Sequence, residues 1–564
     1  MFVPSASSTR RMSCLGLFCL LSAGSAGAEI FRVGIGTGCT HLTVEAAVAA
    51  AAANGSGFDE IQIAHVTQTL GSLVDVDSHS VALVGGFSSC TAAIPTGQTT
   101  LRRSDPTDAF YVHSTTGTSV LSLERITIEM GVSAKRALRL AGDVQALLID
   151  SVLTDGQAPL GENGGNVWMS GDATLALIRS TISLGEVNEG SGGGIYCENG
   201  GTVLVDGGSV VRENKAGVSG GGVFGQDCTI DTQGWIYDNT SSVDGGGISA
   251  TGGSSVRLTG SGDDDFYVLE SNQAGENGGG LYLIGSGTTA IARNARIFGN
   301  VSGVSGGGVM VAGGASFTMD VDPATCSIGH GCSTLFFNNA GTAGGGALNV
   351  TAASSAAIRQ TTIQFNGASE GVGSVAIVFG TLLIEGCEIY FNDGQLLPRV
   401  SRFYVAGSLT IAFSTLDEET EFSGVFWVLS GATFRLYSSI VQADQTFHAP
   451  AFATALDCVI TREQASFPAG GTLLLTVTDP TLIFQSGAPL EYRLKRGSVA
   501  QDYCDTFFYS PVDDDLDNQV RGWDDPTRPN LEGAHDLGAD EWRPDIFHDG
   551  FELAGTARWS GVTP

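Results

Sequence analysis

The sequence predicts an all-β protein that folds as a right-handed parallel β-helix with a short N-terminal cap helix. Three observations support this prediction. Glycine supplies 80 of the 564 residues without a collagen period, and a hydrophobic content of 42% argues against disorder, so a repeat is the better explanation. A unit with one asparagine and three consecutive glycines recurs through the middle of the chain. Each unit holds about three short strand-like pieces and no helix, as expected for one coil of a β-helix.

The first 28 residues are typical of a signal peptide. Arg10 and Arg11 precede an apolar run from Met12 to Ala23, and Ala26-Gly27-Ala28 fits a cleavage site. The apolar run is too short to span a bilayer, and no later stretch approaches the ~18 apolar residues that a membrane helix needs. We therefore expect a bacterial protein that is secreted or associated with the outer membrane or cell surface, with no transmembrane segment after cleavage.

Residues 29–160 are predicted to contain the cap helix and the first coils. The run HLTVEAAVAAAAA at 41–53 favours helix and stops at Asn54-Gly55. A helix there would cover the open edge of the first coil. Cys39 and Cys90 bracket the cap and the first coil, so they are the first candidate disulfide. Nine cysteines would remain after cleavage, which leaves at least one thiol unpaired in a monomer.

Residues 161–485 are predicted to form the Gly-rich repeats. The unit reads N-x-[AS]-x-x-x-G-G-G-hydrophobic, and its asparagines are Asn214, Asn239, Asn272, Asn300 and Asn338. Because equivalent residues of successive coils lie ~4.8 Å apart, these side chains are expected to stack in one structural ladder and bond amide to amide. Longer intervals are interpreted as turn insertions. The insertion at 319–333 holds the second candidate disulfide, Cys326 and Cys332.

Residues 486–545 change composition, with Asp, Pro and Trp in place of Gly, and 546–564 form a short tail. We expect 486–545 to be a capping or anchor-type module that folds over the final coil. Four aspartates occupy positions 1, 3, 5 and 12 of a calcium-loop pattern, although Asn518 replaces the usual glycine: Asp513, Asp515, Asp517 and Asp524. They are a candidate structural calcium site, and the alternative is a solvated acidic turn. No other cofactor is expected.

Three parts of the chain resemble known bacterial proteins. The repeats are similar to those of the polymorphic outer membrane proteins, which are marked by a Gly-Gly-hydrophobic turn and a Phe-x-x-Asn motif, here Phe336–Asn339. Residues 493–541 resemble the closing module of right-handed β-helix proteins of the choice-of-anchor kind, with Asp536–Glu541 matching Asp-Leu-Gly-Ala-x-Glu and Val499 replacing the usual Pro. The tail resembles an ending of secreted proteobacterial proteins. These resemblances imply a pectate-lyase-like solenoid at the cell surface.

No residues form a convincing catalytic site. Gly329-His330-Gly331 matches one motif of polygalacturonase-like hydrolases, but the Arg-Ile-Lys motif of that family is absent. A lyase would need an arginine to take a proton, and the candidates Arg212, Arg257, Arg293 and Arg359 have no stacked acidic cluster beside them in the sequence.

The net charge of −32 argues against nucleic acid and anionic lipid as partners. We expect a non-catalytic protein of adhesion, display or structural role, with a surface or carbohydrate ligand. The alternative is a polysaccharide lyase or glycoside hydrolase that acts on acidic polysaccharide.

Overall fold

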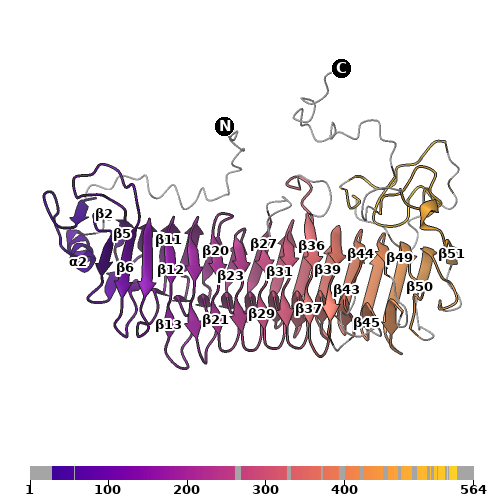
Figure 1. The fold of residues 1–564 in the computed structure, drawn as a ribbon, viewed down its shortest axis with the longest axis horizontal. Coiled ribbons are helices and arrows are strands. Elements are labelled where there is room, and N and C mark those ends of the chain that lie inside the picture. Colours follow the sequence, from indigo (N-terminus) through magenta and orange to yellow (C-terminus); the bar gives the residue numbers. More distant parts are fainter. Residues whose placement is uncertain are drawn as a thin grey trace, which may run out of the picture.

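The structure, a computed structural model, describes residues 28–542 except 56, 261–267, 327–331, 370–371, 393–400, 419–423, 449–454, 468–471, 486–491, 505–508, 510–513, 518, 528–529 and 531–532. These residues are almost entirely β, and their strands stack in parallel into one long rod (Figure 1). The predicted fold class, a parallel β-helix with one helix near the N-terminus, is confirmed.

A coil in the middle of the rod contributes strands to three parallel sheets, as the coil that starts at Ile195 illustrates. β18 (Ile195–Glu198) lies in sheet B, β19 (Thr202–Val205) and β20 (Val210–Arg212) lie in sheet A, and β21 (Lys215–Ala216) lies in sheet C. We expected three strands per coil, so the fourth is a difference. β21 is only two residues long and buries only the small side chain of Ala216, so it has no apolar run that would mark it in the sequence.

Sheets B and C contain one strand from each coil that they include. In the described residues, sheet B comprises β4 (Val74–Asp77), β7 (Phe110–His113), β10 (Leu138–Ala141), β14 (Val167–Ser170), β18, β22 (Val223–Gln226), β26 (Ile248–Thr251), β30 (Leu281–Ile284), β34 (Val309–Ala312), β38 (Leu348–Val350), β42 (Ala376–Val378), β45 (Phe403–Val405) and β48 (Phe426–Val428). Sheet C comprises β13 (Gln157–Ala158), β17 (Glu186–Val187), β21, β25 (Thr240–Ser241), β29 (Gln273–Ala274), β33 (Val301–Ser302), β37 (Asn339–Ala340) and β41 (Gly367–Ala368).

Sheet A contains two rows of strands that meet at a corner, which we call the A-corner. The first row is β1 (Ile30–Val33), β2 (Phe58–Ile63), β5 (Ser80–Val84), β8 (Ser119–Glu124), β11 (Val144–Ile149), β15 (Thr174–Ile178), β19, β23 (Thr229–Thr232), β27 (Ser255–Thr259), β31 (Thr289–Arg293), β35 (Ser316–Asp320), β39 (Ser355–Arg359), β43 (Thr381–Glu385) and β46 (Ser408–Ala412). The second row is β3 (Thr67–Thr69), β6 (Thr99–Arg103), β9 (Ile126–Met130), β12 (Val152–Thr154), β16 (Thr181–Ser183), β20, β24 (Trp235–Tyr237), β28 (Leu269–Glu270), β32 (Arg296–Phe298), β36 (Ser333–Phe336), β40 (Thr361–Gln364), β44 (Glu388–Tyr390) and β47 (Thr415–Asp417).

The last strands of sheet A bend across the A-corner. β49 (Thr433–Gln442) pairs with both β46 and β47, and β50 (Ala455–Thr461) and β51 (Thr472–Thr476) follow it. Residues at this corner adopt the left-handed backbone conformation, as Asp150 (φ 48°) and Gln360 (φ 46°) do. That conformation turns the chain sharply between two strands that remain in the same sheet.

The core is a column of aliphatic and aromatic side chains inside the coils. Alternate strand residues point into it, so that in β7 Phe110 and Val112 are fully buried while Tyr111 and His113 face outward. The α-helix α2 (Val44–Asn54) covers the N-terminal end with its buried face, and the hydroxyl of Thr43 accepts a hydrogen bond from the backbone of Ala46 at 3.3 Å. This is the helix that the alanine run predicts.

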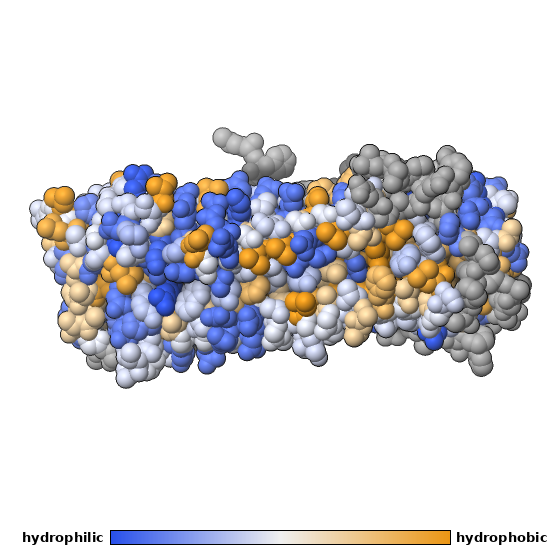
Figure 2. All heavy atoms as spheres, turned by 90° about the horizontal axis from the view of Figure 1, so that it is seen from below, coloured by the Kyte–Doolittle hydropathy of each residue, from blue (hydrophilic) through white to orange (hydrophobic). Residues whose placement is uncertain are grey.

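The lower side of the rod in Figure 1 carries the sheet C strands and the turns around them. Seen from that side, hydrophobic residues are scattered among polar ones along the whole rod (Figure 2). Val218, just after β21, is 38% exposed, and Val301, in β33, is 39% exposed.

The described residues of the C-terminal segment, 477–542, lie along the A-corner. It is the yellow segment above β44, β49 and β50 in Figure 1. Hydrogen bonds join it to the corners of successive coils: Gln360 Nε2 to Asp515 O (2.7 Å), Ala539 N to Thr415 Oγ1 (3.1 Å) and Gly538 N to Ser438 O (3.0 Å).

This position corrects the expectation that residues 486–545 fold over the final coil. At these corners the backbone N atoms of Gly538 and Ala539 donate to oxygens of the rod, and the side chain of Gln360 donates in the opposite direction to Asp515 O. Its apolar residues Tyr492 and Leu537 pack with Ile440 of the rod in a second hydrophobic cluster. The 3-10 helix η1 (Pro480–Leu482) begins the segment.

Candidate functional site

The five asparagines of the predicted ladder lie in one buried row, and each side chain bonds the next. Asn239 Nδ2 donates to Asn272 Oδ1 at 3.0 Å, and the backbone N of Asn239 donates to the same oxygen at 3.1 Å. The full row is Asn166, Asn214, Asn239, Asn272, Asn300, Asn338, Asn366 and Asn392, followed by the carboxylate of Glu418. All of them are buried, so the ladder holds the coils together and faces no ligand.

The three glycines of a unit meet three different constraints, as Gly278, Gly279 and Gly280 illustrate. Gly278 has a φ of +64°, which side-chain-bearing residues rarely adopt. A Cβ on Gly279 would come within 2.5 Å of the backbone of Val301 in sheet C. A Cβ on Gly280 would lie 3.0 Å from the amide carbon of Asn300 in the ladder. The glycines are therefore explained by the repeat itself.

The cysteines are structural. Cys39 and Cys90 form a disulfide with their Cα atoms 5.1 Å apart, and Cys326 and Cys332 form another. Two further disulfides were not anticipated from the sequence: Cys197–Cys228 and Cys458–Cys504, the second of which ties the C-terminal segment to β50. Cys387 keeps a free thiol, and burial raises its pKa to about 12.

The four aspartates of the calcium-loop pattern are not all described, since Asp513 lies outside the described residues. The buried Asp515 carboxylate accepts hydrogen bonds from the backbone N atoms of Asp517, Gln519 and Glu541. Asp524 is exposed. Among the residues that the structure describes, no group of three or more His, Cys, Asp or Glu side chains is placed to hold a metal ion. Calcium binding through Asp513 stays a prediction.

The arginines considered for lyase chemistry each lie within ion-pair distance of a carboxylate. The pairs are Arg212–Glu213 at 3.5 Å, Arg257–Asp231 at 3.9 Å, Arg293–Asp320 at 3.2 Å and Arg359–Glu385 at 3.1 Å. A neighbouring carboxylate favours the charged guanidinium, which cannot take up a further proton. His330, from the motif shared with polygalacturonase-like hydrolases, lies outside the described residues.

The outer face of sheet B carries a row of side chains, one from each strand, which we call the sheet B row. Strand register places them side by side: Asp75, Tyr111, Arg139, Trp168, Tyr196, Phe224, Ser249, Tyr282, Met310, Asn349, Ile377, Tyr404 and Trp427. Seven of these thirteen residues are aromatic, although aromatic residues make up only 8% of the chain. At ~4.8 Å per coil the row extends over ~58 Å.

Aromatic rings in the sheet B row contact each other or a neighbouring ring across the coils. Tyr196 and Phe224 stack with centroids 5.2 Å apart and an interplanar angle of 2°. Tyr404 meets Trp427 at 5.6 Å, and Trp427 lies 4.8 Å from the ring of His448. These rings are half-buried or buried, so each is held in place by its neighbours while part of the row remains open to solvent.

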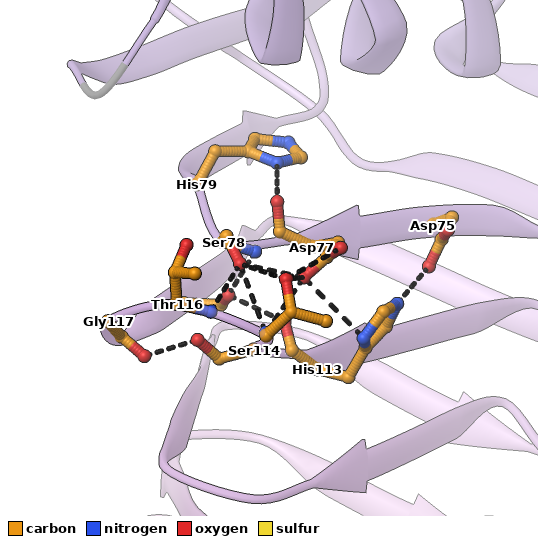
Figure 3. A network of polar contacts seen from close by, with 10 residues as sticks. Asp75, Asp77, Ser78, His79, His113, Ser114, Thr116 and Gly117 are labelled. Atoms are coloured by element: carbon orange, nitrogen blue, oxygen red, sulfur yellow. Dashed lines mark hydrogen bonds and ion pairs between the residues drawn. The ribbon is translucent and has the colours of Figure 1, made fainter.

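A polar network lies at the N-terminal end of this face (Figure 3). His113 points between two carboxylates, with Nε2 at 3.0 Å from Asp75 Oδ1 and Nδ1 at 3.6 Å from Asp77 Oδ1. Ser78 Oγ donates to Asp77 at 2.8 Å, and this bond lowers the pKa of Asp77. Tyr111 stacks on the imidazole at 4.3 Å. Both ring nitrogens of His113 thus face carboxylates, an arrangement that positions the ring but activates no nucleophile.

Carboxyl groups flank the middle of the sheet B row. Tyr196 donates its hydroxyl to Glu198 at 3.0 Å, and burial raises the pKa of Tyr196 to about 12. Burial also raises the pKa of Asp244, which accepts a hydrogen bond from Asn277 Nδ2 at 2.9 Å in the turn beside Tyr282. The row therefore combines aromatic faces with hydrogen-bonding groups at their edges.

A second aromatic cluster lies on another edge of the rod and differs in chemistry. Its core is five phenylalanines, and the buried Tyr390 meets the last of them at 5.6 Å: Phe298, Phe336, Phe337, Phe365 and Phe391. Phe337 stacks on Phe365 at 5.0 Å and is 37% exposed. The phenylalanine side chains have no polar tip with which to recognise a hydroxylated ligand.

Comparison of the chain with family models, curated proteins and solved structures gave no match in any of the three. Among the described residues, no helix has the length and apolar character required to traverse a bilayer. The sheet B row is thus the candidate functional surface on its own chemistry.

Proposed function

We propose that this chain is an exported, non-catalytic glycan-binding protein that acts in adhesion or display at the cell surface, and that the sheet B row is its binding face. One observation carries the proposal: four tyrosines, two tryptophans and one phenylalanine lie in a single straight row. Four disulfides support export, because such bonds persist in oxidising compartments.

The geometry of the row suits an extended carbohydrate. The apolar C–H faces of sugar rings pack on aromatic rings, and the hydroxyl of Tyr and the N–H of Trp bond the sugar hydroxyls. The coils repeat every ~4.8 Å, a distance of the same order as the length of one sugar unit. A glycan laid along the rod would therefore meet the partly exposed rings of the row at intervals of whole coils.

The test measures binding and turnover together. Wild-type protein is applied to an array of immobilised β-linked oligosaccharides, and affinities for the glycans it binds are measured by titration calorimetry. Trp168→Ala and Trp427→Ala are each expected to raise Kd about fivefold, since one aromatic stacking contact contributes ~1 kcal/mol. The bound glycan is expected to keep its length, whereas a lyase or hydrolase would shorten it.

Phe337→Ala is the matched control, because it removes an aromatic ring of the separate phenylalanine cluster and leaves the sheet B row intact. Affinity should be unchanged in this variant. The proposal fails if the wild-type protein binds no glycan on the array, or if Phe337→Ala weakens binding as much as Trp168→Ala does.

A further inference from the structure

The guanidinium of Arg139 occupies an unusual place in the sheet B row. Its strand, β10, lies between β7 and β14, so that Tyr111 and Trp168 flank it in register. The guanidinium carbon lies 4.8 Å from the centroid of Tyr111 and 5.1 Å from that of Trp168. The two rings thus cover the guanidinium and hold it by cation–π contact, which leaves its N–H donors at the edge of the group.

Arg139 has no acidic partner among the described residues, in a chain where 59 acidic residues outnumber 27 basic ones. Arginines on the other faces do pair, as Arg257 does with Asp231 at 3.9 Å. On the adjoining turns, Asp108 and Glu162 pair with the buried Arg136. An arginine fixed between two rings without a carboxylate is preorganised to receive one from a ligand.

We infer that Tyr111, Arg139 and Trp168 form a subsite for a carboxylate-bearing sugar at one position of an otherwise neutral glycan. This inference rests on the proposed function of the sheet B row. The carboxylate accepts two parallel hydrogen bonds from the Arg139 edge while Trp168 packs against the next sugar.

Two features limit the ligand to isolated acidic sugars. Arg139 is the single basic residue of the thirteen in the sheet B row. The net charge of −32 repels a chain that carries a carboxylate on every sugar. Asp75 in the row and Asp77 beside it add to this repulsion near His113. The subsite therefore favours one uronate unit within, or at the end of, a neutral chain.

The experiment compares two probes that differ only in this carboxylate: a β-linked glucose hexasaccharide, and the same oligosaccharide with a terminal glucuronate. Wild-type protein should bind the glucuronate-ended probe at least about tenfold more tightly, as expected for hydrogen bonds to a charged group. Arg139→Gln should abolish that preference, and its far-ultraviolet circular dichroism and thermal midpoint should match those of the wild type, which shows that the variant is folded. Arg139→Lys should recover only part of the preference, because an ammonium cannot bond bidentately.

Arg257→Gln is the matched control, since it removes an outward-facing arginine of sheet A that already has a carboxylate partner. It should leave both affinities unchanged. If the wild-type protein binds the two probes equally, or if Arg139→Gln retains the preference, the carboxylate subsite is wrong while glycan binding by the row stands. If neither probe nor any glycan on the array binds, the proposed function itself is overturned.

Discussion

Removal of one ladder asparagine is expected to destabilise the rod far more than removal of an asparagine on its surface. In Asn272→Ala the amide loses its bonds to Asn300 Oδ1 (3.0 Å) and Ile236 O (2.9 Å). Its carbonyl oxygen no longer accepts from the backbone N (3.1 Å) and Nδ2 (3.0 Å) of Asn239. Four buried hydrogen bonds at ~1 kcal/mol each give a loss of ~4 kcal/mol.

Guanidinium unfolding followed by far-ultraviolet circular dichroism measures this loss from the shift in midpoint at constant slope. The control is Asn277→Ala in the same coil, whose amide bonds the half-exposed Asp244 at 2.9 Å and whose loss should cost less than ~1 kcal/mol. Hydrogen exchange should locate the weakening in the coils next to residue 272, since each coil is held by its neighbours. Equal midpoints for the two variants would refute the argument that the ladder stabilises the rod.

The remaining predictions concern the first disulfide and the pH dependence of stability. Replacing Cys39 and Cys90 together by serine removes a cross-link with a sequence separation of 51 residues. The free energy of unfolding should fall by ~4 kcal/mol in the chain-entropy model, as measured by the same unfolding experiment. A loss below ~1 kcal/mol would mean that the packing of the cap helix already constrains this loop. Burial raises the pKa of Glu418 to about 7, so the folded protein favours its protonated form. The stabilisation that comes from protonated Glu418 is fully present below the ordinary Glu pKa and is lost as the pH rises through 7. Tm should therefore fall between about pH 5 and about pH 8. Glu418→Gln should flatten that dependence, and an unchanged slope would assign it to other groups.

The repeat unit contains most of the information that specifies the rod. The asparagine and the third glycine are adjacent in space, so both recur in the sequence with fixed spacing, and the ladder could be anticipated from Asn214 to Asn338. Asn166 and Glu418, which lie outside the unit, could not. Asn166 reaches the row from a different position in its coil, and Glu418 ends it with another residue type.

Neither the location of the C-terminal segment nor the full sheet B row could be predicted from the sequence, for two different physical reasons. The segment docks in part on the backbone carbonyls of Ser438 and Phe413 at left-handed corners, and a backbone acceptor has no residue signature. Part of the row does show a sequence pattern, because Tyr196, Phe224 and Tyr282 each follow a glycine triplet by two residues. Ser249 interrupts that pattern, and Tyr111 and Trp168 belong to coils without a triplet, so only the register brings them into line.

The side-chain amides of the ladder all point in one direction along the rod. Every amide donates toward the next coil, so the side-chain dipoles from Asn214 to Asn392 add head to tail with their positive ends toward the C-terminus. Glu418 stands at that positive end, where its Oε1 accepts from Asn392 Nδ2 and its Oε2 accepts from Arg402 Nε, each at 2.9 Å. Each intervening asparagine is both donor and acceptor, so a whole coil can be duplicated or deleted in evolution without breaking the series. The length of the molecule is thereby free to vary, while the chemistry of its two ends stays fixed.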